Sequence, residues 1–300
     1  MFDSAALLDL ALFAQASPPF VRATQHPSPP DISLSWIEVA IAACLIGVNA
    51  VLSWQLRLGL ERQIAISSIR MTVQLALLGL VLKQIFSLSS AAPVLALAMV
   101  MTIVAGVAAV RRIDHRFDSI YPSALFAVWS STWLVTAVTV LLIVRPQPWH
   151  SPQVVIPLLG MVLGNSLTGI SLGLDRFLSE LRQRRDEVEL RLMMGGTRWE
   201  ACRDVFASAT RTAMIPILNT MSVAGIVSLP GMMTGQLLAG APPIQAVQYQ
   251  IMIMFVIAAA IAIGVMLALL AAYLRITTPM HQIDWLQIRS KQAGAKATAS

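Results

Sequence analysis

The sequence RRIDHRFD holds the one compact group of side chains suited to acid–base chemistry, with Asp114 and Asp118 on either side of His115. A histidine close to carboxylates is a common general base. The other three histidines lie far away along the chain, in loops and tails between long apolar segments. We therefore interpret the group as part of a solvated loop, with an enzyme active site as the less favoured alternative.

Methionine thioethers are a second set of groups with chemical potential, because they bind soft ions such as Cu(I). Met232 and Met233 are adjacent in a methionine-rich part of the chain. Methionine also fills irregular apolar gaps, and we favour this role. Iron prefers carboxylates or imidazoles, for which Glu38 is the main candidate. The metal ligands are thus unknown, with Glu38, Met232 and Met233 as weak candidates.

The elements that must position these residues are strongly apolar. The chain has 300 residues, of which 57% are hydrophobic and 12% charged, whereas soluble domains contain about 25% charged residues. The apolar residues form runs of about 20, the length that crosses a bilayer as a helix. Strands or loops could not satisfy their backbone polar groups in lipid. The sequence thus predicts an all-α polytopic membrane protein, surrounded by lipid in the plasma (inner) membrane.

About seven transmembrane helices are expected, and the charge pattern orients them. Lys and Arg concentrate after the first, third, fifth and seventh spans, whereas the opposite side has only Arg22, Lys83 and Arg145. The N-terminus is therefore predicted outside and the C-terminus in the cytoplasm. This clustering of basic residues in loops argues against a nucleic-acid partner, despite a net charge of +6. The expected spans are 34–54, 64–86, 91–110, 122–144, 154–174, 212–229 and 249–274.

Three parts are predicted along the chain: an N-terminal extension and linker at 1–33, a transmembrane domain at 34–275, and a cytoplasmic tail at 276–300 that is expected to be disordered. Residues 1–16 end in FAQA and are interpreted as a short amphipathic helix, with a cleaved signal as the alternative. Arg70 falls within the second span, where its side chain can snorkel towards the cytoplasmic side.

A charged block, VELRLMMGGTRWEACRDVF, follows the fifth span and interrupts the apolar sequence. Apolar residues recur on one helical face before Gly195 and Gly196, and glycine is typical of the end of a helix. Thr197 and Glu200 then match the capping box that begins a second helix. The block is thus predicted to be a helix, a tight turn and a helix.

The loop that contains this block, 176–211, is predicted to be cytoplasmic and to present Arg198 and Trp199 at its turn. An ordinary amphipathic hairpin on the membrane surface is the alternative. Glu189 lies six residues before Gly195 in ELRLMMG. This spacing resembles the E-A-A-x-x-x-G coupling loop of ABC transporter permeases, in which a short helix docks into a cytoplasmic ATPase. Leucine and arginine stand here where that motif has alanines.

Three longer stretches are informative: RLGLERQIAISSIRMTVQLALLGLVL, GGTRWEACR and RTAMIPILNTMSVAGIVSLPGMMTGQLLAGAPPIQAVQYQIMIMF. They resemble the FetB-type permeases, described as iron-export ABC permeases, whose relatives include plant aluminium-tolerance permeases. The resemblance covers about 34 to 275. It implies a permease subunit for iron export that works as two copies with a separate cytoplasmic ATPase. A metal chelate, a nucleotide sugar and a lipid-like molecule are the alternative cargoes. The residues expected to couple to the ATPase are Glu189, Gly195, Gly196, Thr197, Arg198, Trp199 and Glu200.

The chain has no G-x-x-x-x-G-K-[ST] motif and thus no phosphate-binding loop of its own. ATP use is therefore expected on the partner subunit, whereas this chain is expected to bind no cofactor and to be no enzyme. An intramembrane enzyme is a less favoured function. A secondary transporter is also disfavoured, because such proteins usually show internal repeats and ionisable residues near mid-membrane.

Polar residues and helix breakers in the fifth and sixth spans are candidates for a transport pathway. Asn165 and Ser166 lie mid-span and need hydrogen-bond partners, either as links between helices or as polar lining. Pro230 and Gly231 should break the sixth span, so 228–243 is interpreted as an outer gate or re-entrant turn, with a simple connector as the alternative. The candidate pathway or gate residues are Asn165, Ser166, Asn219, Ser222, Pro230, Gly231, Met232, Met233 and Gly235.

Glycines also repeat at a spacing of four in the fifth span, at Gly160 and Gly164 and again at Gly169 and Gly173. Such faces allow helix backbones to approach closely. Packing within the membrane is the favoured role of these glycines, and a dimer seam or a pathway lining is the alternative.

Overall fold

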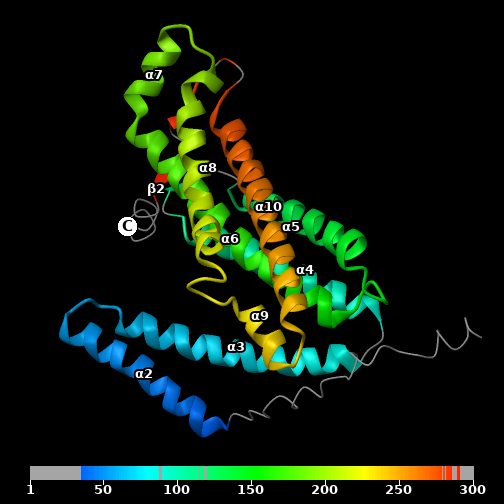
Figure 1. Cartoon of the computed structure of the whole chain (residues 1–300). Coiled ribbons are helices and arrows are strands. Elements are labelled where there is room, and N and C mark those ends of the chain that lie inside the picture. Colours follow the sequence, from blue (N-terminus) through cyan, green and yellow to red (C-terminus); the bar gives the residue numbers. More distant parts are fainter. Residues whose placement is uncertain are drawn as a thin grey trace, which may run out of the picture.

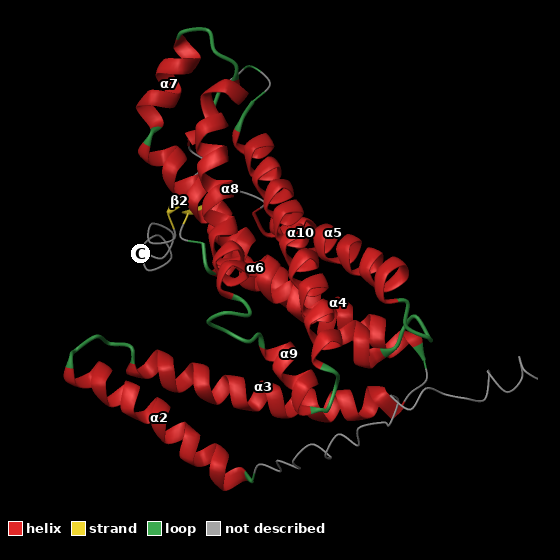
Figure 2. Cartoon of the chain, in the orientation of Figure 1, coloured by secondary structure: helices red, strands yellow, loops and turns green. Residues whose placement is uncertain are grey.

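The computed structural model describes residues 35–87, 90–113, 115–117, 120–278, 280, 282–285 and 289–290. This part of the chain is almost entirely helical (Figures 1 and 2). The predicted extension at 1–33 and most of the predicted tail at 276–300 lie outside the described residues, so the expectations for them stay predictions.

The helices follow one another with short connections. Two-residue strands, β1 (His115–Arg116) and β2 (Arg289–Ser290), pair antiparallel. The helices are α2 (Trp36–Gln55), α3 (Glu61–Ser87), α4 (Ala91–Arg111), α5 (Ile120–Val138) with its π-helical continuation η1 (Thr139–Val144), α6 (Pro152–Gln183), α7 (Arg185–Met193), α8 (Arg198–Val223), α9 (Gly231–Leu238) and α10 (Pro243–Ile276).

Within the described residues, six segments are long and apolar enough to cross a membrane: α2, α3, α4, α5 with η1, α6 and α10. They coincide with six of the seven predicted spans, and the all-helical polytopic class is confirmed. The predicted orientation of the termini stays a prediction. α6 and α10 are longer than a bilayer requires, and α6 extends into the predicted cytoplasmic loop.

The remaining predicted span, 212–229, is divided between α8 and the turn that follows it. α8 begins in the charged block, so its apolar part is too short to cross a bilayer alone. It ends at Val223, after which Gly225 has a φ of 82° and its N–H donates to the carbonyl of Ser228. Figure 1 shows α8, this turn and α9 leading together from the α7 end of the bundle to the opposite end, where α10 begins.

The break in this span lies earlier than predicted. Pro230 and Gly231 were expected to end the helix, but it ends at Val223, and Pro230 is instead the N-cap of α9. Proline suits the first positions of a helix, where no N–H donor is needed. α8 leaves the helical conformation at Ala224, whose ψ is 131°, and the left-handed backbone at Gly225, which few other residues adopt, then turns the chain.

The core lies where α5, α6, α8 and α10 pack against one another. Glycines allow the closest approaches: a Cβ added at Gly169 of α6 would lie 2.6 Å from Cγ2 of Ile261 on α10. Gly173 packs in the same way against Ala213 and Val265. This pair thus serves packing within the chain, the favoured interpretation, whereas Gly164 is exposed on the outer side of α6.

The α2–α3 hairpin diverges from this bundle (Figure 1). None of the most apolar stretch of α3 is buried among the described residues. The hairpin is anchored near the far end of α3, where Ile85 packs with Val94 of α4 and Ile156 of α6 in a small separate cluster. The rest of α3 is therefore free to meet lipid, water or another molecule.

Gly169→Ala is expected to destabilise the bundle by about 1–3 kcal/mol, because the new methyl group overpacks against the stiff β-branched Ile261. Gly164→Ala is the matched control in the same helix, since no described atom lies within 4 Å of its added Cβ. Thermal unfolding in detergent micelles should show a lower midpoint for the first variant and an equal or higher one for the second. Equal midpoints for the two variants would contradict this packing.

Candidate functional site

Two adjacent glycines form the turn between α7 and α8, and both are required by geometry. Gly195 has a φ of 90°, a left-handed conformation. The N–H of Gly196 donates to the carbonyl of Arg191 at 3.0 Å, and a Cβ added at Gly196 would lie 2.8 Å from that same oxygen. A side chain at either position would therefore strain or open the turn.

The predicted capping box begins α8. The N–H of Glu200 donates to Oγ1 of Thr197 at 3.3 Å, and the N–H of Thr197 donates to Oε2 of Glu200 at 2.8 Å. These backbone and side-chain hydrogen bonds from Thr197 lower the pKa of the Glu200 carboxyl. The turn is thus closed from both sides, by the glycines at the end of α7 and by the cap of α8.

Charged side chains hold α7 against α8. Arg191 donates to Glu187 on its own helix and to Oδ2 of Asp204 on α8, both at 2.8 Å. The hydrogen bond and charge of Arg191 lower the pKa of Asp204. Glu189, expected to couple to the ATPase, pairs with Arg185 at 2.8 Å along the helix. Each exposed pair stabilises little alone, but the network fixes the orientation of α7.

Glu180 joins the hairpin to the membrane helices. It is buried near the end of α6 that the charge pattern predicts to be cytoplasmic. Arg176 donates to it there at 2.9 Å and Arg184 at 3.3 Å. Ser208 of α8 donates its hydroxyl to the same carboxylate at 2.7 Å. A buried carboxylate with these donors pins α6 to α8, so the two helices can move as one body at this end.

Arg198 departs from the prediction that it is presented at the turn. Its Nη1 donates to the carbonyl of Thr278 at 3.2 Å, and its guanidinium lies over the ring of Tyr273. Trp199 is 44% exposed and packs edge-on against Phe206 and Tyr273. The physical reason is the position of the C-terminal end of α10 beside the start of α8. Arg198 thus ties these two helices together.

The exposed tip of the hairpin is apolar instead. Met193 and Met194 are 77% and 72% exposed, and Leu190 is also exposed on the same helix. We call these three residues the apolar tip. The sequence interpretation assigned them no role, although two methionines beside a glycine pair in a charged helix are an unusual pattern. Apolar side chains exposed outside the lipid typically mark an interaction site.

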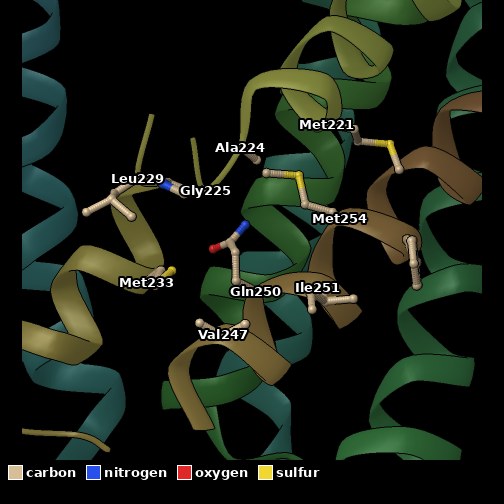
Figure 3. Close-up of a pocket in the computed structure, with 11 residues that line it drawn as sticks. Met221, Ala224, Gly225, Leu229, Met233, Val247, Gln250, Ile251 and Met254 are labelled. Atoms are coloured by element: carbon tan, nitrogen blue, oxygen red, sulfur yellow. The ribbon is translucent and has the colours of Figure 1, made fainter. Parts of the chain in front are cut away.

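A pocket of about 610 Å³ lies at the other end of α8 (Figure 3), beside the turn that ends it, α9 and the first turns of α10. Two of the predicted gate residues, Pro230 and Met233, line it. Most of its wall is apolar. The lining residues are Met221, Ala224, Gly225, Leu229, Pro230, Met233, Val247, Gln250, Ile251, Met254 and Phe255.

Gln250 supplies the central polar group of this pocket. Its side chain is 8% exposed, and its Oε1 has no hydrogen-bond partner among the described residues. Figure 3 shows the amide between Met254 and Met233. An unpaired buried carbonyl oxygen is costly, so a bound molecule with a donor group would gain from contacting it. Sequence reasoning missed Gln250, because the rest of the pocket wall outside α10 comes from α8, α9 and the turn between them.

The other predicted pathway residues are scattered. Asn219 and Ser222 are exposed on α8, and Ser222 returns its hydroxyl to the carbonyl of Leu218. Asn165 is exposed on α6 and donates to the carbonyl of Met161 at 2.8 Å. Asn165 and Ser222 therefore satisfy part of their hydrogen bonding within their own helices, and all three side chains are open on their outer sides.

Ser166 is fully buried, and its hydroxyl has no partner among the described residues. Met232 packs against the core, whereas Gly231 and Gly235 are exposed in α9. Gly235 has no positive φ and lies within the helix. These four residues thus do not join Met233 and Pro230 in the pocket wall.

Metal ligation receives no support from clustered hard donors. Glu38 accepts from the backbone N–H of Ser35 at 2.7 Å and caps α2. Within the described residues, no group of three or more His, Cys, Asp or Glu side chains is placed to hold a metal ion. Asp114 and Asp118, from the group suited to acid–base chemistry, lie outside the described residues.

The protein family described as "Uncharacterised protein family (UPF0014)" matches residues 36–277. This chain belongs to that family. The match takes in every helix described above, and the relatives below confirm the resemblance predicted from the sequence.

Several relatives are similar over most of their length. The chain is 37% identical to UPF0014 membrane protein slr1647 of Synechocystis sp., covering 75% of this chain and 87% of the relative. It is 35% identical to UPF0014 membrane protein YjkA of Bacillus subtilis, covering 83% and 98%. It is 28% identical to the "Probable iron export permease protein FetB" of Escherichia coli, covering 85% and 96%. No solved structure matches the chain. The chain is therefore an integral membrane protein of the UPF0014 family.

Gly196→Ala is expected to open the turn between α7 and α8, because its methyl group would collide with the carbonyl of Arg191. We expect it to lower the local stability by about 1–3 kcal/mol. Amide hydrogen exchange should accelerate at the end of α7 and the start of α8. Gly235→Ala in α9 is the matched control, since no described atom lies near its added Cβ. Unchanged exchange in the Gly196 variant would contradict the turn geometry.

The capping box should also respond to pH in one direction. Because the folded state lowers the pKa of Glu200, its stabilising effect is present above the ordinary carboxyl pKa and is lost as pH falls through the lowered value. Exchange protection at the start of α8 should therefore persist into mild acid and then decline. Glu200→Gln should remove this pH dependence. A decline of the same size in the Gln variant would assign the effect to another group.

Proposed function

We propose that this chain is the membrane-spanning permease subunit of an ABC transporter in the plasma (inner) membrane, driven by a separate cytoplasmic ATPase. The observation that carries the proposal is the capped α7–α8 hairpin with its exposed apolar tip. A charged hairpin that exposes Met193 and Met194 outside the lipid presents a surface suited to a protein partner. We propose that the same surface includes the neighbouring residues Glu189, Thr197, Trp199 and Glu200.

The hairpin is built to transmit force. α6 is longer than a bilayer requires and is joined to α7 through the single residue Arg184, and Glu180 fixes it to Ser208 of α8. Arg198 fixes the start of α8 to the end of α10. A displacement of the tip would therefore reach three membrane helices as a rigid-body motion, which is the way packed helices transmit switching.

The same helix that begins at the coupling turn ends at the pocket. α8 runs from Arg198 to Val223, and Met221, Ala224 and Gly225 at its end line the pocket. Movement at the ATPase side would thus change the pocket wall directly. This connection supports a pathway in which cargo passes beside the end of α8 and α9.

Iron export is the transport we propose first, because the Escherichia coli relative carries that function in its name. The pocket offers thioethers and one amide but no carboxylate. A metal chelate, a nucleotide sugar or a lipid-like molecule is therefore the alternative cargo. We also propose a second copy of the chain in the transporter, because Asn165, Asn219 and Ser222 are exposed on the outer sides of α6 and α8.

Replacing both tip methionines, Met193→Ser with Met194→Ser, is expected to weaken binding of the ABC-type ATPase subunit of the same host at least about 10-fold, the effect of losing two buried apolar anchors. Co-purification and ATP hydrolysis in proteoliposomes measure the loss. Asp186→Ser, on the exposed side of the same hairpin, is the matched control and should bind normally.

Transport is tested with the same proteoliposomes and a panel of Fe(II), ferric citrate, Cu(I), Zn(II), aluminium citrate and a nucleotide sugar. Cargo-stimulated hydrolysis that needs both subunits supports the permease proposal and identifies the cargo. If the tip variant binds and stimulates like the unaltered chain, the hairpin is a surface structure and the proposal fails.

A further inference from the structure

α3 carries a polar face in the middle of an apolar hairpin. Gln63, Ser67, Arg70 and Gln74 follow one another at spacings of four, three and four. Residues at these spacings share one side of a helix. We call these four residues the polar stripe.

The side chains of the polar stripe have no partners in the described part of the chain. All four are exposed, and no hydrogen bond or ion pair of their side chains is formed there. Ser68 and Thr72, elsewhere on α3, instead donate to the carbonyls of Ile64 and Ser68 at 2.9 and 3.0 Å. The hydroxyl groups of Ser68 and Thr72 thus have hydrogen-bond acceptors within α3, whereas the side chains of the polar stripe have no hydrogen-bond partner in the described part of the chain.

The stripe lies too deep to be explained by snorkelling alone. At 1.5 Å per residue, Arg70 lies about 14 Å from the start of α3 at Glu61, and Gln74 lies about 20 Å from it. Arginine can extend its head towards the interface, but glutamine is too short and lies further in. A charged or polar face at this depth normally meets protein or a water-filled cavity.

The direction of the stripe agrees with this. Ile85 lies about three helical turns beyond Gln74 and so on the same face of α3. Ile85 is buried against Val94 and Ile156 of the bundle. The polar stripe therefore continues into the face by which the far end of α3 meets the bundle, whereas Ala65 and Ala76 lie on the opposite face, where Thr72 bonds within its own helix.

We propose that the polar stripe lines the cargo path and that Arg70 binds an anionic group of the cargo. This inference rests on the proposed permease function and adds the charge of the substrate. A guanidinium is always charged and donates in a fork that fits carboxylate and phosphate oxygens. A bare divalent cation would be repelled by it. The cargo is thus anionic as it crosses, as a metal held in a carboxylate chelate or as a phosphate ester.

The first test is independent of the ATPase and of the cargo. Single cysteines replace Ser67, Gln74, Ala65 and Ala76 in a chain whose own Cys44 and Cys202 are changed to alanine. The assembled protein in proteoliposomes is then treated with an anionic and with a cationic methanethiosulfonate reagent. Ser67→Cys and Gln74→Cys sample the stripe, and Ala65→Cys and Ala76→Cys sample the opposite face at similar depths.

The two stripe cysteines should react at least about 10-fold faster than the two control cysteines, and the anionic reagent should be favoured at Gln74→Cys because a cationic group raises its local concentration. Adding Arg70→Gln should remove that preference. Equally slow reaction at all four positions would place the stripe in lipid or in a sealed interface. A preference that survives Arg70→Gln would remove Arg70 from the role. Either result overturns the inference.

The second test uses cargo-stimulated ATP hydrolysis with ferric citrate, a nucleoside diphosphate sugar and free Fe(II) in separate arms. Arg70→Gln should reduce stimulation by the anionic cargo about 10-fold or more, the effect of losing a charge-assisted hydrogen bond, while co-purification with the ATPase stays normal. Arg70→Lys should restore part of it. The first two arms distinguish a carboxylate chelate from a phosphate ester.

Failure of this inference is distinguishable from failure of the permease proposal. Loss of ATPase binding in the tip variant, together with unchanged anion stimulation in Arg70→Gln, keeps the permease and overturns the role of Arg70. Stimulation by free Fe(II) alone overturns it as well.

Discussion

Backbone amide and carbonyl groups find no water inside a bilayer, and this constraint shapes the whole molecule. It forces each apolar run into a helix, so that α2 to α6 and α10 satisfy their own hydrogen bonds. Irregular backbone is tolerated only where protein or a cavity surrounds it. The turn from Ala224 to Pro230 is irregular, exposes Ile226 and Val227 in the single chain, and lies beside the pocket. The departure from helical structure and the candidate cargo site are thus one feature.

In the transporter that we propose, the two ends of α8 have different roles. At one end, hydrogen bonds and ion pairs that involve Glu180, Arg191 and Arg198 hold the hairpin stiffly against α6 and α10. At the other end, the helix gives way to the turn at Ala224 and Gly225, beside a cavity lined by thioethers and Gln250. In this proposal the hairpin end of α8 is stiff and the pocket end is irregular. A small movement of the hairpin would therefore change the shape of the pocket.

Local patterns in the sequence predicted the parts of the fold that depend on neighbouring residues. The glycine pair and the capping box of Thr197 and Glu200 were predictable because all their partners lie within a few positions. The length and polarity of the apolar runs predicted the span helices for the same reason. The family resemblance rested on longer stretches of sequence and added the permease hypothesis.

Contacts between distant helices could not be predicted in this way. Arg198 reaches Thr278, just beyond the end of α10, so it is tied to that helix end and not presented at the turn as predicted. The pocket joins Met221, Met233 and Met254 from three helices, and one sequence gives no register between them. The end of α8 was misplaced because proline looked like the stronger breaker, whereas the backbone becomes extended at Ala224 and turns at Gly225.

The small contact area between α3 and the bundle also bears on how the protein is made. α2 and α3 leave the ribosome before α4 and α6, and domains and hairpins generally form in the order of synthesis. Because the hairpin needs only Ile85 and its neighbours to meet the bundle, it can enter the membrane as an independent pair. Its final position is then set late, when Val94 and Ile156 are in place. The small contact thus allows the chain to assemble in two steps, first as a loosely attached hairpin and then as a closed bundle.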